Sequence, residues 1–422
     1  MRLTVLLPIL SLCAAAPAAA GPIGVERFVD LAVKNDTALL SAEQDIIISR
    51  QRLREARSLL LPQISFSGSL SRLSLEYPMV TPPELGGRFL DAGYGDNTYA
   101  LRAHVVQPVY TGGRNRNAAR MARNAWSQSR LLLETERLAA AREAREAFCE
   151  ALYRRELLEA ASSYHLRALA LAGRAGGGWD ALETGAAADW FAREKDRAEH
   201  SYAGGLSALS ALIRNENGVM EIEGELAAEP PSGTLQKALI AAMERRPELR
   251  GEIYRAQMDE IALNMASLRR YPNVYIGAVY DVVAYDADSF SNMERTGSWA
   301  ASVAIHFPLS YDWWTQITQR RAQQRQGSLK RVEIEERLRG ELRSAWSEAA
   351  YRLKEAASAR AALEEAAADY ERALRSRPAE TGRAAAGLRT LYGKELALLE
   401  SLYLQKMAAI RLAWAQGKGL PE

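Results

Sequence analysis

The stretch Leu53-Arg-Glu-Ala-Arg-Ser-Leu-Leu-Leu-Pro-Gln63 decides the fold, because Ala262-Leu-Asn-Met-Ala-Ser-Leu-Arg-Arg-Tyr-Pro-Asn273 repeats its pattern further along the chain. In each copy a helix-like segment ends in proline and an alternating strand pattern follows. Gln107-Pro108-Val109-Tyr110 is echoed in the same way by Phe307-Pro308-Leu309-Ser310. Such self-similarity predicts two copies of one unit, each with the order helix, strand, loop, strand and very long helix.

Composition indicates a folded protein with balanced charge. Among its 422 residues, 54 Lys and Arg stand against 52 Asp and Glu, which gives no sign of a nucleic-acid surface. A hydrophobic content of 48% and a mean hydropathy of −0.23 are too polar for a bundle of membrane-spanning helices. After the N-terminal segment no apolar run approaches the roughly 18 residues that a membrane-spanning helix needs.

The N-terminus has the layout of a secretory signal peptide over residues 1–20. Arg2 precedes the apolar run 3–12, and Ala18-Ala19-Ala20 offers a small-residue cleavage site. A short buried helix is the alternative. We expect Cys13 to leave with the signal, since Leu12 is too large for the usual lipidation motif. Only Cys149 then remains, so no internal disulfide is expected.

Four segments alternate apolar with small or polar residues and predict strands at about 62–75, 97–109, 272–283 and 297–308. In the second of them, Leu101 and Ala103 share one face while Arg102 and His104 share the other. Alternation over about ten residues is typical of a transmembrane strand, and equally of a soluble sheet with one wet face. Aromatic residues at the helix-proximal strand ends favour a membrane interface over ordinary packing, and they are Tyr110, Tyr271, Tyr311, Trp313 and Trp314.

Four strands are too few to close a membrane barrel, since the smallest such barrels have about 8 strands. An open sheet edge in lipid would leave unpaired backbone groups at a cost of several kcal/mol each. The chain must therefore borrow strands from other copies, and three protomers would supply a 12-stranded barrel. This incompleteness predicts a homotrimer in contact with lipid.

Two long helical hairpins are predicted at about 114–212 and 314–416. No proline or glycine interrupts the chain from Arg114 to about Leu171, and strong helix formers dominate. Glycines at 173–178 break the first hairpin, and residues 378–382 break the second. The predicted organisation is a first repeat at 21–214, a linker at 215–233 and a second repeat at 234–422, whose first helix is capped by Ser232 or Thr234. A soluble coiled-coil spacer is the alternative.

Five fragments in this order resemble the TolC-type outer-membrane efflux proteins: residues 60–65, 107–114, 245–250, 271–273 and 307–309. The resemblance implies an α+β membrane protein whose trimeric 12-stranded β-barrel continues into an α-helical coiled-coil tunnel. It implies the outer membrane of a Gram-negative bacterium, with the tunnel extending into the periplasm. It also implies two partners, a periplasmic adaptor (membrane fusion) protein and an inner-membrane pump.

The resemblance also implies a barrel-to-helix junction and a periplasmic entrance. The junction would lie at Pro62, Pro108, Gly112, Gly113, Pro272 and Pro308. The entrance would lie at the hairpin tips, where the nearest charged residues are Asp180, Glu183, Asp189, Glu380, Arg383 and Arg389. A ring of like charge around a threefold axis would select permeants, although charges at a tip are more often simply solvated. The tips depart from the family pattern, as does Tyr311-Asp312-Trp313-Trp314, which stands where the first copy has Gly-Gly-Arg.

No constellation for catalysis or metal binding is visible in the sequence. The four histidines lie far apart, at positions 104, 165, 200 and 306, and no phosphate-binding or nucleophile motif occurs. We therefore expect no cofactor, no metal and no enzyme activity. The predicted function is a passive exit duct of a tripartite efflux or type I secretion system, for small molecules or polypeptides. The alternative is an exported periplasmic or surface coiled-coil scaffold or adhesin without a pore.

Overall fold

The computed structural model describes residues 22–74, 77–80, 89–90, 95–215, 220–228, 230, 233–284, 296–308, 312–376 and 380–418. The expected signal peptide, Cys13, Tyr311 and most of the polar loop 284–297 lie outside these residues. The chain divides into two compact units. The helical unit takes residues 1–40, 135–246 and 337–422, and the sheet unit takes residues 41–134 and 247–336.

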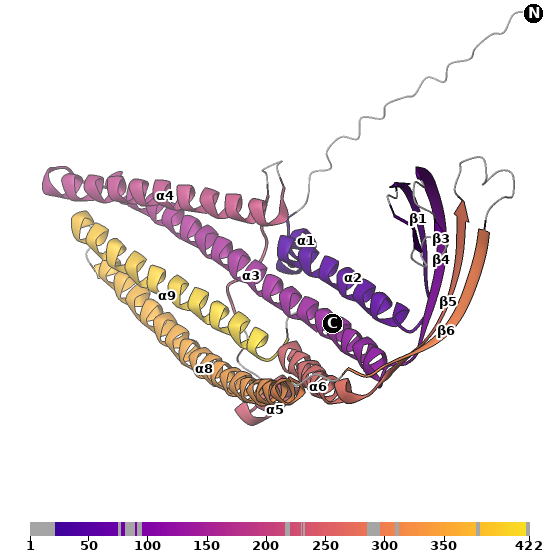
Figure 1. Ribbon diagram of the computed structural model, residues 1–422. Coiled ribbons are helices and arrows are strands. Elements are labelled where there is room, and N and C mark those ends of the chain that lie inside the picture. The colour runs from indigo at the N-terminus through magenta and orange to yellow at the C-terminus, as the bar shows by residue number, and fades with distance from the viewer. Residues whose placement is uncertain are drawn as a thin grey trace, which may run out of the picture. The chain divides into compact units, whose positions relative to one another are not determined.

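The sheet unit contains four antiparallel strands in the order β1-β4-β5-β6 (Figure 1). They are β1 (Gln63–Ser74), β4 (Gly95–Tyr110), β5 (Asn273–Ala284) and β6 (Thr296–His306). A small hairpin, β2 (Met79–Val80) with β3 (Phe89–Leu90), forms a separate sheet that the strand pattern did not predict. Both outer strands, β1 and β6, have one strand neighbour within the described residues, so the four-stranded sheet is open at both edges.

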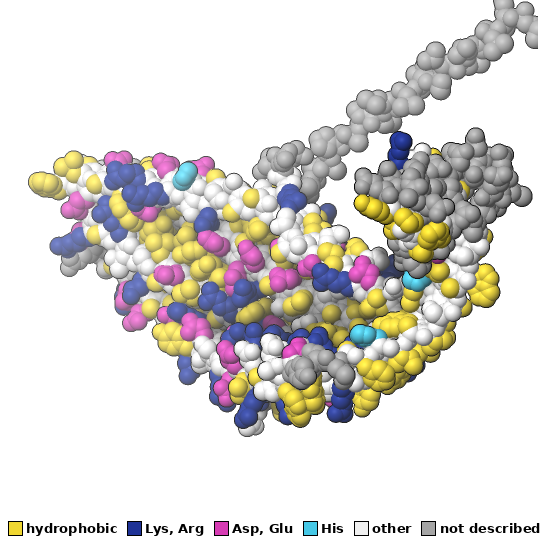
Figure 2. All heavy atoms as spheres, in the orientation of Figure 1, with side chains coloured by type: hydrophobic (Ala, Val, Ile, Leu, Met, Phe, Trp, Pro, Cys, Tyr) yellow, Lys and Arg dark blue, Asp and Glu magenta, His cyan; other side chains and the backbone are white. Residues whose placement is uncertain are grey.

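Neighbouring rows across the sheet have opposite character. One row is wholly apolar and consists of Phe66, Ala103, Tyr280 and Trp299. The next row is wholly polar and consists of Ser67, Arg102, Asp281 and Ser298. Because successive residues of a strand point to opposite faces, these rows lie on opposite sides of the sheet. Phe66 is 81% exposed and Trp299 is 78% exposed, and hydrophobic side chains gather over the strands in Figure 2.

The sheet unit also contains helices, which a few polar contacts join. These helices are most of α2 (Thr37–Ser58), α6 (Pro247–Ser267) with the short η2 (Leu268–Arg270), and the first parts of α3 (Arg114–Ala172) and α8 (Trp313–Ser376). Ser49 Oγ on α2 lies 2.7 Å from Ser129 Oγ on α3, and Arg250 on α6 forms a 3.7 Å ion pair with Glu134 on α3. None of the described helices is long and apolar enough to cross a membrane.

The helical unit contains two hairpins, in which α4 (Gly178–Ile213) folds back along α3 and α9 (Thr381–Ala415) along α8 (Figure 1). Long helices form here because α3 contains no glycine or proline over its 59 residues. The shorter α1 (Val25–Asn35) and α5 (Leu235–Arg245) complete the unit. Thr234 caps α5, since its hydroxyl accepts the backbone N–H of Lys237.

The linker between the repeats is tied to the helical unit by backbone and side-chain bonds. Ile23 and Ile222 form a parallel β-bridge. The guanidinium group of Arg155 on α3 donates to the carbonyl oxygens of Ile222 and Gly224, at 2.8 and 2.9 Å. These bonds satisfy carbonyl groups that would otherwise lack partners in a segment without regular structure.

An aromatic cluster forms the core between the hairpins. Phe191 on α4 is fully buried, and its ring centroid lies 5.9 Å from that of Tyr164 on α3 and 5.4 Å from that of Tyr392 on α9. Burial raises the pKa of Tyr392 to about 12, so its hydroxyl stays neutral at physiological pH. Residues from α3, α4, α8 and α9 all join this cluster, which therefore holds the two hairpins together.

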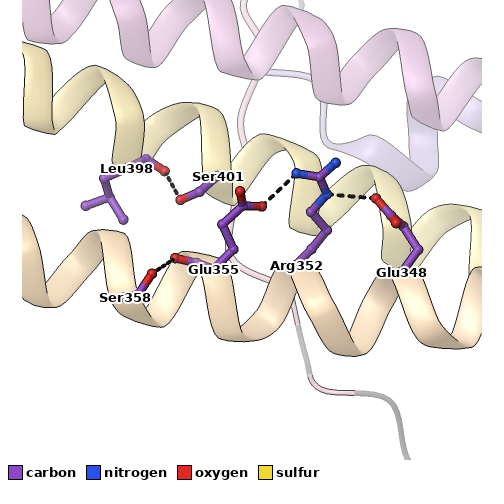
Figure 3. A network of polar contacts seen from close by, with 6 residues as sticks. All are labelled: Glu348, Arg352, Glu355, Ser358, Leu398 and Ser401. Carbon is purple, nitrogen blue, oxygen red and sulfur yellow. Dashed lines mark hydrogen bonds and ion pairs between the residues drawn. The ribbon is translucent and has the colours of Figure 1, made fainter.

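A second core lies near α5 and contains cation–π contacts between two arginines and one tryptophan. The guanidinium groups of Arg142 and Arg246 lie 4.5 and 4.3 Å from the ring centroid of Trp414. Arg246 is almost fully buried and forms a 3.0 Å ion pair with Glu341. By contrast, the pairs that Arg352 forms with Glu348 and Glu355 along α8 lie at the surface and contribute little to stability (Figure 3).

Candidate functional site

The two hairpin turns meet at the start of α9. A Cβ atom added to Gly382 would lie 2.8 Å from Oδ1 of Asp180 and would overlap the Glu183 carboxylate. Because Gly382 has no side chain, the backbone of α9 lies directly against these two carboxylates of α4. The carboxylates lie beside the first turn of α9, where the helix dipole favours negative charge. The structure thus brings Asp180 and Glu183 against a residue that is distant in sequence.

Basic residues of the second hairpin lie at the same end of the unit. Arg383 forms a 2.8 Å ion pair with Glu380 one turn earlier on the chain. The Arg389 guanidinium donates to the carbonyl oxygen of Ala186 at 3.2 Å and lies 5.6 Å from the ring centroid of Trp190. Asp189 is exposed further along α4. The tips therefore carry both acidic and basic groups, and Arg383 and Glu380 partly cancel each other's charge.

Sequence reasoning missed two apolar residues at this end. Trp179 is 81% exposed and Leu182 is 64% exposed, both in the first turns of α4. They follow a turn in which Gly177 and Gly178 take φ values of +99° and +65°, a conformation that favours glycine. Large apolar residues directly after a glycine run were the available signal. Exposed apolar side chains at a helix end are candidates for contact with another protein.

A groove lies beside the tips, between α8 and α9. Its volume is about 570 Å³, and its lining includes Tyr370, Leu374, Glu380, Arg383, Gly387 and Leu391. A Cβ atom added to Gly387 would lie 3.0 Å from the ring of Tyr370, so the absence of a side chain at this position lets α9 approach that ring. The groove and the exposed apolar residues occupy the same end of the helical unit as the charged pairs.

The expected junction residues lie at or near the ends of the strands, where the chain enters or leaves them. Pro62 and Pro272 directly precede β1 and β5, and Pro308 follows the end of β6. Pro108 lies at an irregularity of the β4–β5 register, between Pro108 and Tyr110.

Two glycines form the turn from β4 into α3. Gly112 and Gly113 have φ values of +60° and +80°, which residues with a side chain rarely adopt. A Cβ atom at Gly112 would also lie 2.9 Å from the Cβ of Tyr271, so this turn needs glycine for space as well as conformation. Arg114, the first residue of α3, donates to the Asn273 side chain at the start of β5. The strand-to-helix turn of one repeat is thus fixed to the strand start of the other.

No group of three or more His, Cys, Asp or Glu side chains within the described residues is arranged to hold a metal ion. The buried thiol of Cys149 has its pKa raised to about 12 by burial, so it stays protonated and unreactive.

Comparisons with known proteins agree with this architecture. Residues 28–173 match the sequence model of a protein family described as outer membrane efflux protein. No match was found among curated proteins.

Solved structures of outer-membrane channels resemble nearly the whole chain. The Campylobacter jejuni CmeC outer membrane channel is 15% identical, with a TM-score of 0.75 over 94% of this chain and 86% of that one. The Neisseria gonorrhoeae MtrE outer membrane channel, in its open state, is 17% identical, with a TM-score of 0.75 over 94% and 89%. The outer membrane protein VceC from Vibrio cholerae is 14% identical, with a TM-score of 0.75 over 94% and 97%. The resemblance to the outer-membrane efflux proteins is therefore confirmed, by the family match over residues 28–173 and by the fold over nearly the whole chain.

Proposed function

We propose that this chain is the outer-membrane channel of a tripartite efflux or type I secretion system, a passive trimeric exit duct for small molecules or polypeptides. One observation carries the proposal. Among the described residues, the four-stranded sheet is open at both edges, exposes an apolar row on one face and presents a polar row on the other. A soluble sheet would cover Phe66 and Trp299, so the scaffold alternative is not favoured.

Three copies of the sheet would close a barrel. Pairing β1 of one protomer with β6 of the next satisfies both open edges and gives twelve strands around a threefold axis. The apolar face then meets lipid in the outer membrane, and the polar face lines the water-filled interior. At 1.5 Å per residue, the 59 residues of α3 extend about 90 Å, a length suited to a tunnel through the periplasm.

The trimer itself is testable with purified protein. We expect the protein, extracted in detergent, to have the mass of three protomers, and to migrate on gels as a slow trimer band before boiling and as a faster monomer band after boiling. In planar bilayers it should open stable conductance steps, since a closed barrel encloses water. Recovery of the mature protein as a monomer from the soluble periplasmic fraction would contradict the proposal.

The hairpin tips form the periplasmic entrance in this proposal. Trp179 and Leu182 would contact a periplasmic adaptor, which passes on substrate from an inner-membrane pump, and the charged pairs around Gly382 would gate the opening. The outer-membrane localisation and both partners belong to the proposal. Specificity for one class of permeant would then depend mainly on the pump.

A double variant, Trp179→Ser with Leu182→Ser, tests the tip contact. We expect export from cells to fall at least about tenfold, because two central apolar contacts are worth about 2 kcal/mol or more in a protein interface. Conductance of the purified variant should stay at the wild-type level, because both side chains are exposed in the protomer. The measurement compares efflux in cells with single-channel recordings.

The matched control for the tip variant is Tyr351→Ser, which removes a similarly exposed aromatic residue from the middle part of α8. This control should export normally. Equal export by the tip variant and the control would show that the tip makes no productive contact. Loss of conductance in the tip variant would assign the defect to the channel itself.

A further inference from the structure

The polar row of the sheet contains a bidentate ion pair between the two repeats. Nε of Arg102 on β4 donates to Oδ1 of Asp281 on β5 at 2.6 Å, and Nη2 donates to Oδ2 at 3.0 Å. The two residues are direct partners in the strand register. Parallel donation from both nitrogens fixes the guanidinium plane against the carboxylate, which is the strongest geometry for such a pair.

Burial makes this pair different from the helical surface pairs. The side chain of Asp281 is 8% exposed and that of Arg102 is 29% exposed. Partly buried charges are screened less by salt than fully exposed ones, so a member of the pair without its counter-charge would project a local field. The carboxylate and the guanidinium group here neutralise each other.

The alternation of side chains along each strand determines on which face of the sheet the ion pair lies. Ser67 pairs with Arg102 in the register, and Ser298 pairs with Asp281, so the whole row shares one face. The adjacent row, which contains Phe66 and Trp299, is apolar and points the other way. The ion pair therefore lies on the face that the proposed barrel turns toward its water-filled interior.

We propose that the Arg102–Asp281 pair sets the ion selectivity of the barrel. The inference rests on the proposed function, because it needs three copies around a common axis. Three arginines and three aspartates then lie at one level of the pore, and their charges sum to zero. Rings of like charge select ions of opposite sign, so removing either partner exposes a ring of three charges that the wild-type pore lacks.

The test measures the Cl⁻/K⁺ permeability ratio of purified trimers in planar bilayers under a KCl gradient. We expect Asp281→Asn to raise the ratio about threefold or more, because three guanidinium charges lose their counter-charge. Arg102→Gln should lower the ratio by a similar factor. The double variant should return it to near the wild-type value. Opposite shifts that cancel are a signature that a merely structural role would not produce.

Arg72→Gln is the matched control. Arg72 is exposed on β1, and its register partner is Asn97 on β4. Its position in the strand places it on the same face as Phe66, away from the proposed interior. This variant loses the same charge from the same sheet, and we expect its permeability ratio to equal that of the wild type.

The outcomes separate the inference from the proposed function. If wild-type protein opened no conductance, the duct would be wrong and the inference with it. If it conducted, and both single variants kept the wild-type ratio or shifted it in the same direction, only the inference would be wrong. Should Asp281→Asn fail to give a boiling-sensitive trimer, Arg102→Gln decides alone, because it leaves an acidic ring whose effect on the ratio has a fixed sign.

Discussion

Replacing Phe66 and Trp299 together with arginine will keep the protein out of the outer membrane. Both side chains are mostly exposed on the apolar face of the sheet, in the same row across the strands. An arginine at the midplane of a bilayer costs a membrane barrel about 2–4 kcal/mol. Two such costs in each of three protomers exceed the marginal stability of most folded proteins.

Two measurements follow the insertion of this variant: the amount in washed outer membranes, and the boiling-sensitive trimer band. We expect both to fall to the detection limit. The matched control is Ser65→Arg with Ala300→Arg, which places the same two charges one residue away on the same strands. These positions lie on the polar face, so the control should insert and form trimers. Equal insertion of both double variants would contradict the assignment of the two faces.

Truncating Phe191 to alanine will destabilise the helical unit by about 3–5 kcal/mol, the usual cost of removing a buried aromatic side chain. Phe191 is fully buried where α3, α4 and α9 meet, and its ring packs against those of Tyr164, Trp190 and Tyr392. The cavity left behind has helices on all sides, and long helices cannot close it by a local shift. We therefore expect the two hairpins to separate more readily.

Unfolding in guanidinium chloride, followed by the helical circular dichroism signal of the detergent-solubilised protein, measures this loss. The midpoint for Phe191→Ala should move to lower denaturant than that of the wild type. Trp179→Ala serves as the control, since it removes a larger aromatic side chain that is mostly exposed, and its midpoint should not move. Similar midpoints for Phe191→Ala and the wild type would show that the aromatic cluster does not hold the hairpins together.

Much of the fold could be predicted from local sequence. Alternation such as Leu101, Arg102 and Ala103 identifies a strand with two unlike faces, and a helix-forming run without glycine or proline identifies α3. The repeated proline-ended segments reveal the duplication. The duplicated arrangement of strands and long helices follows from these three signals. The hairpin of β2 and β3 could not be found in this way, because strands of two residues are too short to show any period.

The contacts at the hairpin tips and across the sheet were harder to predict from the sequence, because they join distant parts of the chain. Nothing near Gly382 in the sequence indicates that its backbone lies against Asp180 and Glu183. The pairing of Arg102 with Asp281 depends on the register between two repeats, and a slip of one residue would move every side chain to the other face. The alternation along each strand predicted on which face of the sheet each charged side chain lies, but it could not predict which residue of the neighbouring strand that side chain pairs with.

The division into two units has a consequence for how the chain acquires its structure. Each unit combines segments that are separated by about a hundred residues, and the helical unit needs residues 337–422. A chain that emerges from the ribosome N-terminus first cannot pair β4 with β5, or enclose Phe191 with α9, until most of its length has been synthesised. Nascent chains therefore expose strand edges and apolar helix faces throughout most of synthesis. We expect chaperones that hold unfolded chains to bind these exposed surfaces.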